Sequence, residues 1–343
     1  YVDLVVDQLA LTSQAAPQPG EAVTATWRTR NLGTRALTSG WRERLQLLNS
    51  DTGAILLTID LDNDGELAAG GERGQTRSFV WPTGTASAGN FALRVVTDVD
   101  ARVTEANPGG DAENNNSADL RRTTGPDLRV GNLLVDPADA AAAQAGSTLH
   151  LSWDDWNDGL SAIDATYYDR VTVWQVDSGR IVVDTAVACS PSTTGEDLAG
   201  RILRPGEYRK RRFDLHLPDG RDGSGRLEIR ITADQDEHGN GAWFESNATS
   251  DAETNNSATV AVVSASKPYA DLQVDSFSAP DSAIGAMPLT LSWTVANHGG
   301  TATAGEWNDQ IVYSTDTVFG NADDVVLATV RHIGALGVGE SYR

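Results

Sequence analysis

VTATWRTRNLG at residues 23–33 recurs as LHLSWDDWNDG at 149–159 and as LTLSWTVANHG at 289–299. Each stretch places a tryptophan in an alternating run of polar and apolar residues, four residues before an Asn-x-Gly motif. The second stretch follows the first by 126 residues, and the third follows the second by 140 residues. Self-similarity at such a long spacing indicates a chain built from repeated domains.

Other short motifs repeat around these stretches in the same order. Each copy opens with Asp-Leu and later contains Leu-x-x-Gly, and these motifs occur at Asp3-Leu4, Asp127-Leu128, Asp271-Leu272, Leu67–Gly70, Leu203–Gly206 and Leu336–Gly339. The first two copies also share Glu-x-Asn followed by Glu-x-Asn-Asn near their ends. The repeat predicts domains at residues 1–124, 125–266 and 267–343, with the third truncated before its last strands.

The second copy is longer than the first. Its offset grows from 126 residues at the tryptophan to 140 residues in the closing motifs, which requires insertions. We expect the larger insertion within residues 185–198, a polar segment that contains Cys189. Because Cys189 is the only cysteine, an intrachain disulfide is excluded and core packing has to stabilise each domain.

The residues of each copy favour strands over helices. In the first copy, short segments rich in β-branched and aromatic residues are separated by Gly, Pro, Asn and Asp, and they span residues 4–11, 22–30, 44–48, 54–59, 76–81, 91–97 and 117–121. About seven short strands in a unit of this length are typical of an immunoglobulin-like β-sandwich. The sequence therefore predicts an all-β chain of tandem immunoglobulin-like β-sandwich domains, with Trp27, Trp153 and Trp293 in the cores.

Composition excludes several classes of function. The 343 residues include 48 Asp and Glu against 26 Lys and Arg, which gives a formal net charge of −22. Such a chain repels phosphate, so we expect no nucleic-acid partner. No apolar run approaches the roughly 20 residues of a membrane helix. The sequence begins at Tyr1 without a signal segment, and we interpret it as a piece of a longer chain with neighbouring domains.

Taken together, these motifs resemble the CARDB family, the "cell adhesion related domain found in bacteria". The resemblance is carried by the Asp-Leu openings, the Trp strands ending in Asn-x-Gly, the segments 307–309 and 313–316, the Leu-x-x-Gly-Glu motif at 336–340, and the Glu-x-Asn endings. It implies immunoglobulin-like sandwiches in tandem, in large secreted or surface-attached bacterial proteins, with an adhesive or spacer role and calcium association. It implies no catalytic residues. The first copy departs from the pattern at Trp41-Arg42-Glu43.

Acid and amide side chains gather in the segment before the last strand of the first two copies. The candidate metal ligands are Asp98, Glu105, Asn107, Glu113 and Asn115 in the first copy and Asp234, Glu245, Asn247, Glu253 and Asn255 in the second. Calcium prefers six to eight oxygen ligands supplied by a loop that can wrap around it. The sequence therefore predicts calcium in these loops, while an alternative stays open in which the same residues only form turns.

Three further clusters invite a binding function. Residues 60–66 alternate acids before a glycine, but we favour a solvated turn because the motif is incomplete. In the third copy, four acids surround a predicted hairpin at Asp309, Asp316, Asp323 and Asp324. The pair Trp243-Phe244 could stack on a sugar, but we favour a role in anchoring its long loop.

We therefore predict a non-catalytic extracellular adhesion or spacer array, located at the surface of a bacterium or secreted by it. None of the five histidines recurs at a repeat position or has metal-binding spacing on a helix, which gives no support to an enzyme. The partner would be an unknown surface glycan or protein. The alternative is a carbohydrate-binding or accessory region of a secreted hydrolase.

Overall fold

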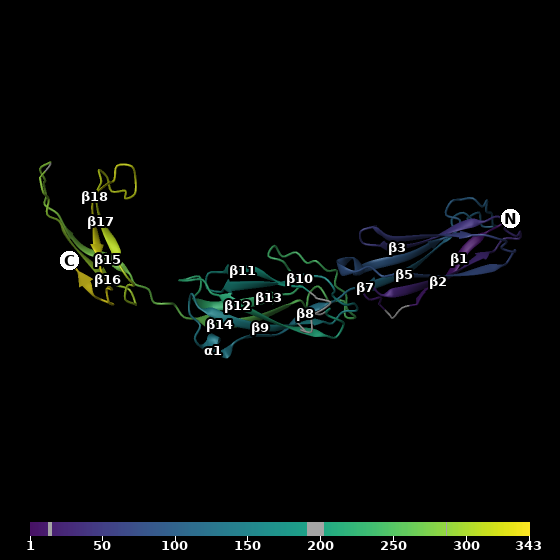
Figure 1. The fold of residues 1–343 in the computed structure, drawn as a ribbon, viewed down its shortest axis with the longest axis horizontal. Coiled ribbons are helices and arrows are strands. Elements are labelled where there is room, and N and C mark those ends of the chain that lie inside the picture. The colour runs from purple at the N-terminus through teal and green to yellow at the C-terminus, as the bar shows by residue number, and fades with distance from the viewer. Residues whose placement is uncertain (13–15, 191–201, 286) are drawn as a thin grey trace. The chain divides into compact units, whose positions relative to one another are not determined.

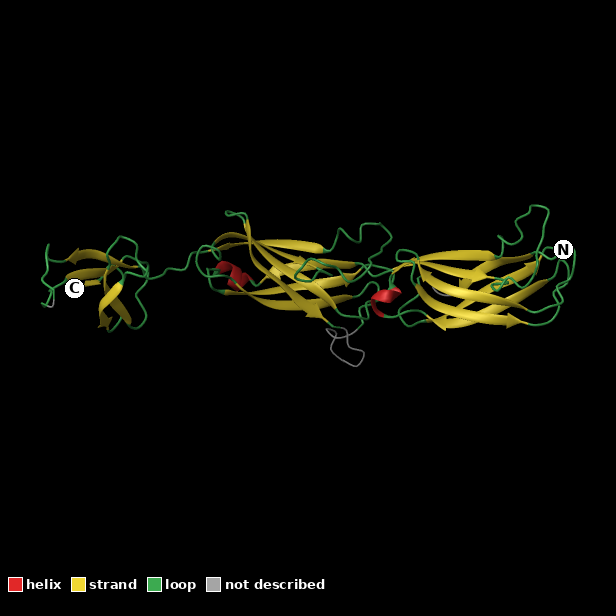
Figure 2. Cartoon of the chain, turned by 90° about the horizontal axis from the view of Figure 1, so that it is seen from above, coloured by secondary structure: helices red, strands yellow, loops and turns green. Residues whose placement is uncertain are grey.

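The computed structural model describes residues 1–12, 16–190, 202–285 and 287–343, and these form two compact units, Tyr1–Ala265 and Ser266–Arg343. The regular secondary structure of both units is almost entirely antiparallel strand (Figures 1 and 2). The all-β prediction is therefore confirmed. None of the helices in these residues has the length and apolar character required to cross a membrane.

The first sandwich contains the seven expected strands. They are β1 (Leu4–Thr12), β2 (Ala22–Asn31), β3 (Trp41–Asn49), β4 (Ile55–Asn63), β5 (Glu72–Val80), β6 (Gly89–Val96) and β7 (Ser117–Thr124), with a short 3₁₀ helix at Gly84–Ser87. One sheet has the order β1-β2-β5, and the other has the order β4-β3-β6-β7. Two antiparallel sheets that face each other in this way form a sandwich around one core.

The second sandwich repeats this topology. Its strands are β8 (Leu128–Val135), β9 (Thr148–Asn157), β10 (Tyr167–Gln175), β11 (Arg180–Cys189), β12 (Tyr208–His216), β13 (Gly225–Thr232) and β14 (Ser257–Ser264). The sheets have the orders β12-β9-β8 and β11-β10-β13-β14, which match the first sandwich strand for strand. An additional short helix, α1 (Pro137–Ala141), begins after Asp136, whose carboxylate accepts a hydrogen bond from the backbone N–H of Ala138.

The second unit holds a smaller set of strands. They are β15 (Leu272–Ser278), β16 (Ser292–Asn297), β17 (Trp307–Tyr313), β18 (Val325–His332) and β19 (Ser341–Tyr342). The sheets have the orders β15-β16-β19 and β17-β18. These correspond to β1-β2-β5 and β4-β3 of the first sandwich, so β17 has one neighbour where β3 has two.

The core of each complete sandwich lies between its sheets. In β3 and β6 alternate side chains are buried, as the twofold periodicity of a strand requires. Trp27 and Trp153 are each only 1% exposed, which confirms the prediction for these two residues. Trp293 is only partly buried and lines a hollow of about 430 Å³ in the second unit, so its placement in a closed core was wrong. The sheet β17-β18 is too narrow to cover it.

The asparagine of Asn-x-Gly explains why that motif repeats. Asn157 accepts hydrogen bonds from the backbone N–H groups of Asp127 and Gly159 and donates to the carbonyls of Ser161 and Leu203. Asn31 and Asn297 make the same four kinds of contact in their own copies. One buried amide thus ties the start of the first strand to the Leu-x-x-Gly turn, and its full satisfaction makes burial acceptable.

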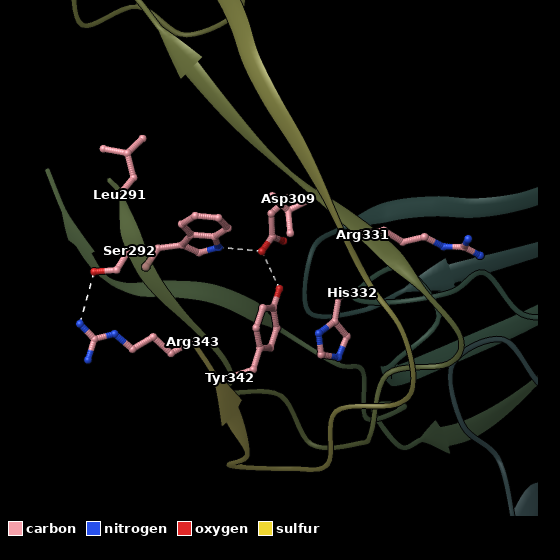
Figure 3. Close-up of a pocket in the computed structure, with 9 residues that line it drawn as sticks. Leu291, Ser292, Asp309, Arg331, His332, Tyr342 and Arg343 are labelled. Atoms are coloured by element: carbon pink, nitrogen blue, oxygen red, sulfur yellow. Dashed lines mark hydrogen bonds between the residues drawn. The ribbon is translucent and has the colours of Figure 1, made fainter. Parts of the chain in front are cut away.

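An acid joins the two sheets in every copy, buried in the first two copies and partly buried in the third. The indole Nε1 of Trp27 lies 3.0 Å from Glu43, that of Trp153 lies 3.2 Å from Asp169, and that of Trp293 lies 2.8 Å from Asp309. Figure 3 shows the hydroxyl of Tyr342 directed at Asp309, at 2.7 Å. Glu43 therefore occupies the same place as the two aspartates despite the departure at residues 41–43.

Two other sequence expectations need correction. Asp60 and Asp62 do not form a solvated turn, because they lie in β4 and pair with Arg44 and Arg42 on β3 at 2.7 and 2.9 Å. The segment 185–189, expected to begin an insertion, is part of β11, and Cys189 is buried at its end. Residues 191–198 of the predicted insertion lie outside the described residues.

Candidate cation site at the start of each sandwich

A long loop before the last strand returns to the first strand of the same sandwich. In the first sandwich, the loop between β6 and β7 reaches residues just before β1, where the backbone N–H of Ala106 donates to the carbonyl of Val2 at 2.9 Å. In the second, the N–H of Ser246 donates to the carbonyl of Pro126 at 2.8 Å. These bonds place the glutamate that precedes each donor, Glu105 and Glu245, beside the Asp-Leu motif.

The glutamates bind the start of the first strand. Glu105 accepts from the backbone N–H of Leu4 and, at 3.0 Å, from the side-chain amide of Asn116. Glu245 accepts from the N–H of Leu128 at 3.2 Å. The structure thus brings together residues that lie more than a hundred positions apart.

A second glutamate in each loop holds the first one. Glu113 accepts from the backbone N–H of Glu105 at 2.9 Å, and Glu253 accepts from that of Glu245 at 3.2 Å. The two carboxylates of each pair therefore lie on the same part of the loop. Their mutual repulsion would favour a cation between or beside them.

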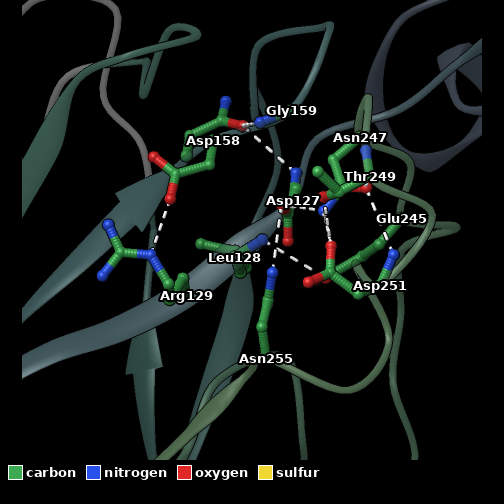
Figure 4. A network of polar contacts seen from close by, with 11 residues as sticks. Asp127, Leu128, Arg129, Asp158, Gly159, Glu245, Asn247, Thr249, Asp251 and Asn255 are labelled. Carbon is green, nitrogen blue, oxygen red and sulfur yellow. Dashed lines mark hydrogen bonds and ion pairs between the residues drawn. The ribbon is translucent and has the colours of Figure 1, made fainter.

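The aspartate of the Asp-Leu motif is part of this cluster, although it was not among the predicted site residues. Asn247 and Asn255 both point at Asp127 and donate to its Oδ2 at 2.7 and 3.2 Å (Figure 4). In the first sandwich, Asn107 and Asn115 donate to Oδ1 of Asp3 at 3.5 and 3.0 Å. The repetition of Asp-Leu was the sequence signal for this residue, but only the fold shows what it contacts.

The predicted aspartates have a different place. Asp98 has a left-handed backbone, with φ of 45°, and accepts from the N–H groups of Arg102 and Val103 at 3.1 and 2.8 Å. Asp234 has φ of 49° and accepts from Ala242 and Trp243 at 2.9 and 2.8 Å. Both carboxylates thus close a turn, and Asp234 also lines a polar hollow of about 410 Å³ together with Glu253.

Burial changes the acidity of these carboxyl groups. Desolvation raises the pKa of Glu245 to about 9, and the nearby charges of Asp234 and Glu253 add to the shift. Desolvation also raises the pKa of Glu105 to about 7 and that of Asp234 to about 6. Holding several such groups ionised in one place requires a compensating positive charge.

The remaining oxygens of the second cluster have no hydrogen-bond donor. Within the residues that the structure describes, four buried oxygens there have no partner: Oδ1 of Asp127, Oε1 of Glu245, Oδ1 of Asn255 and Oδ1 of Asn256. In the first cluster, the corresponding atoms are only the Oδ1 atoms of Asn115 and Asn116. Buried polar atoms are normally satisfied, so a group of oxygens without donors fits a hard cation.

Carboxylate oxygens alone are too few to form a cation site in these clusters. In the described ranges, no three His, Cys, Asp or Glu side chains are arranged so that they could hold a metal ion by themselves. The donor set is a mixture of carboxylate and amide oxygens, and amide and carbonyl oxygens are ordinary ligands of calcium but poor ligands of softer metals.

The other candidates have structural roles in the fold. Trp243 is 5% exposed and packs in the core of the second sandwich, as favoured for a loop anchor. Asp309 lies against Trp293, whereas Asp323 accepts from the N–H of Thr315 at 2.9 Å and Asp316 accepts from that of Val318 at 2.7 Å. Asp309 is therefore apart from the other three acids, which share one turn: Asp316 and Asp323 both accept from the hydroxyl of Ser314, at 3.5 and 3.3 Å, and Asp324 accepts from the backbone N–H of Gly320.

Comparison with known proteins supports the resemblance seen in the sequence. Residues 1–119 match the CARDB family model. No curated protein matches the chain. Among solved structures, the crystal structure of a CARDB domain from Pyrococcus furiosus in complex with di-metal ions is similar over 36% of this chain and 88% of its own, at 20% identity and a TM-score of 0.26.

Two other solved structures are also similar. The solution NMR structure of the same Pyrococcus furiosus domain is similar over 36% of this chain and 94% of its own, at 20% identity and a TM-score of 0.26. Red sea bream transglutaminase is similar over 76% of this chain and 31% of its own, at 10% identity and a TM-score of 0.30. The family match therefore covers the first sandwich, residues 1–119, and the repeated motifs and the strand topology described above recur in the second sandwich.

Proposed function

We propose that the chain is an extracellular adhesion or spacer array of a bacterial surface or secreted protein, and that calcium stabilises its sandwiches. The adhesion-related role of the family supports the first part. The repetition of one strand topology in consecutive sandwiches also supports it, because such repeats extend a chain by stacking similar units.

The calcium part rests on one observation, the group of buried oxygens without donors around Asp127 and Glu245. Asp127, Glu245 and Asn255 would hold the ion, with Glu253 and Asn247 adjacent to it. A bound calcium ion would supply the positive charge that compensates the negative charge of these carboxylates. The residues contribute a preformed oxygen cage that links the loop 245–256 to the first strand of the sandwich.

A calcium ion that links the loop 245–256 to the first strand would stiffen the point at which the chain enters the second sandwich. Gly125 accepts hydrogen bonds from the N–H groups of Leu160 and Ser161 at 2.8 and 3.0 Å. A Cβ at Gly125 would lie 2.6 Å from the carbonyl oxygen of Phe244. The segment before Asp127 therefore lies between residues 160–161 and Phe244. A cation bound to Asp127 would restrict the motion of the end of this segment.

Titration calorimetry and thermal melting of the whole chain test the calcium part. We expect saturable calcium binding, and a higher melting temperature in calcium than in sodium at the same ionic strength, because a ligand that binds only the folded state stabilises it. The double substitution Glu245→Gln with Glu253→Gln should remove most of this difference. The matched control is Glu228→Gln with Glu237→Gln, two exposed glutamates of the same sandwich.

The outcome that contradicts the calcium part is equally definite. Equal melting curves in sodium and calcium, with no saturable heat, would leave the loop residues as turn-forming groups only. Retention of the calcium effect in the double variant would place the ion elsewhere.

A further inference from the structure

The first two sandwiches belong to one compact unit, and three loop segments meet where the second sandwich follows the first. Residues 16–20 and 82–88 close this end of the first sandwich. Residues 160–165 connect β9 to β10 in the second sandwich. We call the contact between these segments the joint.

The side chain of Gln18 bonds to the backbone of the second sandwich through both ends of its amide. Its Nε2 donates to the carbonyl of Leu160 at 3.0 Å, and its Oε1 accepts from the backbone N–H of Ala162 at 3.0 Å. Ala162 is only 5% exposed. A planar amide that uses its donor and its acceptor on one segment fixes both the distance and the orientation of that segment.

A second polar contact runs from the other loop of the first sandwich. The backbone N–H of Gly84 donates to Oδ1 of Asp164 at 2.9 Å, and a Cβ at Gly84 would lie 3.7 Å from the Cβ of Ala165. Ala88 is 4% exposed and belongs to the same cluster of buried side chains as the core of the second sandwich. The small residues thus allow the two sandwiches to approach closely between the polar contacts.

Each side of the joint is fixed by the core of its own sandwich. In the first sandwich, Nε1 of the buried Trp81 donates to the carbonyl of Ser87 at 3.2 Å, and the hydroxyl of Ser87 donates to the carbonyl of Gly84 at 2.7 Å. In the second sandwich, the buried amide of Asn157 donates to the carbonyl of Ser161 at 2.9 Å. Contacts within each sandwich therefore position the groups that meet, which lowers the conformational entropy lost when the joint forms.

The chain that connects the two sandwiches is buried at the joint. Thr124, Gly125 and Pro126 are all buried, and the hydroxyl of Thr124 donates to the carbonyl of Pro17 at 3.4 Å. Domains joined by an exposed, flexible linker are expected to move relative to each other. A buried linker between hydrogen-bonded loops removes the freedom on which such motion depends.

The repeat supplies a comparison for Gln18. Gln144 has the same position in the second sandwich, nine residues before the tryptophan of the second strand. It pairs with Ala265 and is exposed. In the third copy the residue at this position is Ile284, so the sandwich fold does not require a glutamine there. The bonds from Gln18 to residues 160 and 162 therefore belong to the joint and not to the fold of a single sandwich.

We propose that Gln18 and Asp164 hold the first and second sandwiches as one rigid body, with a fixed relative orientation in solution. The end surface of the first sandwich is in this view a binding surface whose partner is the β9–β10 turn of the following sandwich. The inference deepens the proposed spacer role, on which it rests for its purpose. It does not depend on calcium, because no residue of the cation cluster forms these contacts.

Pulsed electron spin resonance on the whole chain tests the proposal, with calcium removed by a chelator. Spin labels at Thr76→Cys on β5 and Arg212→Cys on β12, two exposed positions, report the distance between the sandwiches. We expect one narrow distance distribution. The double substitution Gln18→Ala with Asp164→Ala should broaden it about twofold or more, because domains without a fixed interface move relative to each other. The measurement needs neither calcium nor an adhesive partner, so its failure is distinguishable from failure of the proposed function.

The matched control is Gln144→Ala, which should leave the distribution unchanged. A chain without the added cysteines measures any labelling of the buried Cys189. Amide hydrogen exchange is a second readout, since Gln18→Ala removes the acceptor of the Ala162 N–H and should accelerate its exchange.

Melting temperatures show whether the variants remain folded, and Gln18→Ala alone provides the same comparison if the double variant does not fold. A broad distribution in the parent chain, a width unchanged by the substitutions at the joint, or equal broadening by Gln144→Ala would each overturn the proposal.

Discussion

The indole N–H of Trp27 donates to the carboxylate of Glu43 across the interior of the first sandwich, from β2 in one sheet to β3 in the other. Trp41 donates to the same carboxylate at 3.1 Å. A buried acid costs free energy unless it is hydrogen-bonded, and here two indoles and the hydroxyl of Thr29 supply the donors. In the first two copies the tryptophan of the second strand is therefore both a core side chain and the donor to an acid on the facing sheet.

Removal of the corresponding tryptophan in the second sandwich should be strongly destabilising. Trp153→Ala should lower the free energy of unfolding by about 3–5 kcal/mol, because it leaves a cavity and removes a donor from Asp169. Trp174→Ala is the control, since Trp174 lies in the same sandwich but is 43% exposed. Urea unfolding of both variants decides the point, and equal stabilities would mean that Trp153 is not a core residue.

Stability without calcium should fall as the pH rises from about 5 to about 9. The pKa of Glu105 is raised to about 7 and that of Glu245 to about 9, so in this window the folded chain binds protons that the unfolded chain has lost. By linkage, the state that binds more protons is destabilised as the pH increases. Urea midpoints in the presence of a chelator measure the trend.

Glu245→Gln provides the test of the residue responsible for the pH dependence. Glutamine cannot ionise, so this variant should lose the part of the slope between about pH 7 and 9. A wild-type chain whose stability is constant or rises across the window would contradict the assignment.

Gly159 should not tolerate a side chain. A Cβ at this position would lie 2.3 Å from the backbone carbon of Pro126, and Gly33 and Gly299 meet backbone atoms at similar distances in their copies. Gly159→Ala should therefore destabilise the chain by about 2 kcal/mol or more. Gly74→Ala is the control, because no atom lies within 4 Å of a Cβ built there. A melting temperature equal to that of the control would refute the close contact.

The unit of residues 266–343 should expose apolar surface when it is studied alone. Val274, Phe277 and Leu327 are 63%, 60% and 56% exposed, and β17 pairs only with β18. We expect this fragment to bind a hydrophobic dye and to unfold without a sharp transition, in contrast to residues 1–265. Cooperative melting without dye binding would show that its two sheets are sufficient for a closed fold.

Local sequence predicted the strands of the first two copies because alternation and turn residues act over a few positions. The repeat also identified Asn157 and Gly159, whose contacts the structure shows to be the same in each copy. Local patterns gave the wrong prediction where contacts with other strands determine the structure. Asp60 was predicted to lie in a turn, but it is part of β4 and pairs with Arg44 on β3. The role of Asp127 was equally hidden, because its partners Asn247 and Asn255 lie 120 and 128 residues away.

The contact between Leu128 and Glu245 also determines when the second sandwich can complete its folding during synthesis. The two residues are separated by 117 positions, so the first strand is synthesised long before the loop that caps it. Contacts at such long sequence separation slow folding, since chain entropy is lost before they form. Until then, the unpaired edge of an early strand is open to the similar strands of a neighbouring repeat. An array of these sandwiches is thus safest when each copy folds in turn, as soon as its own last loop has been made.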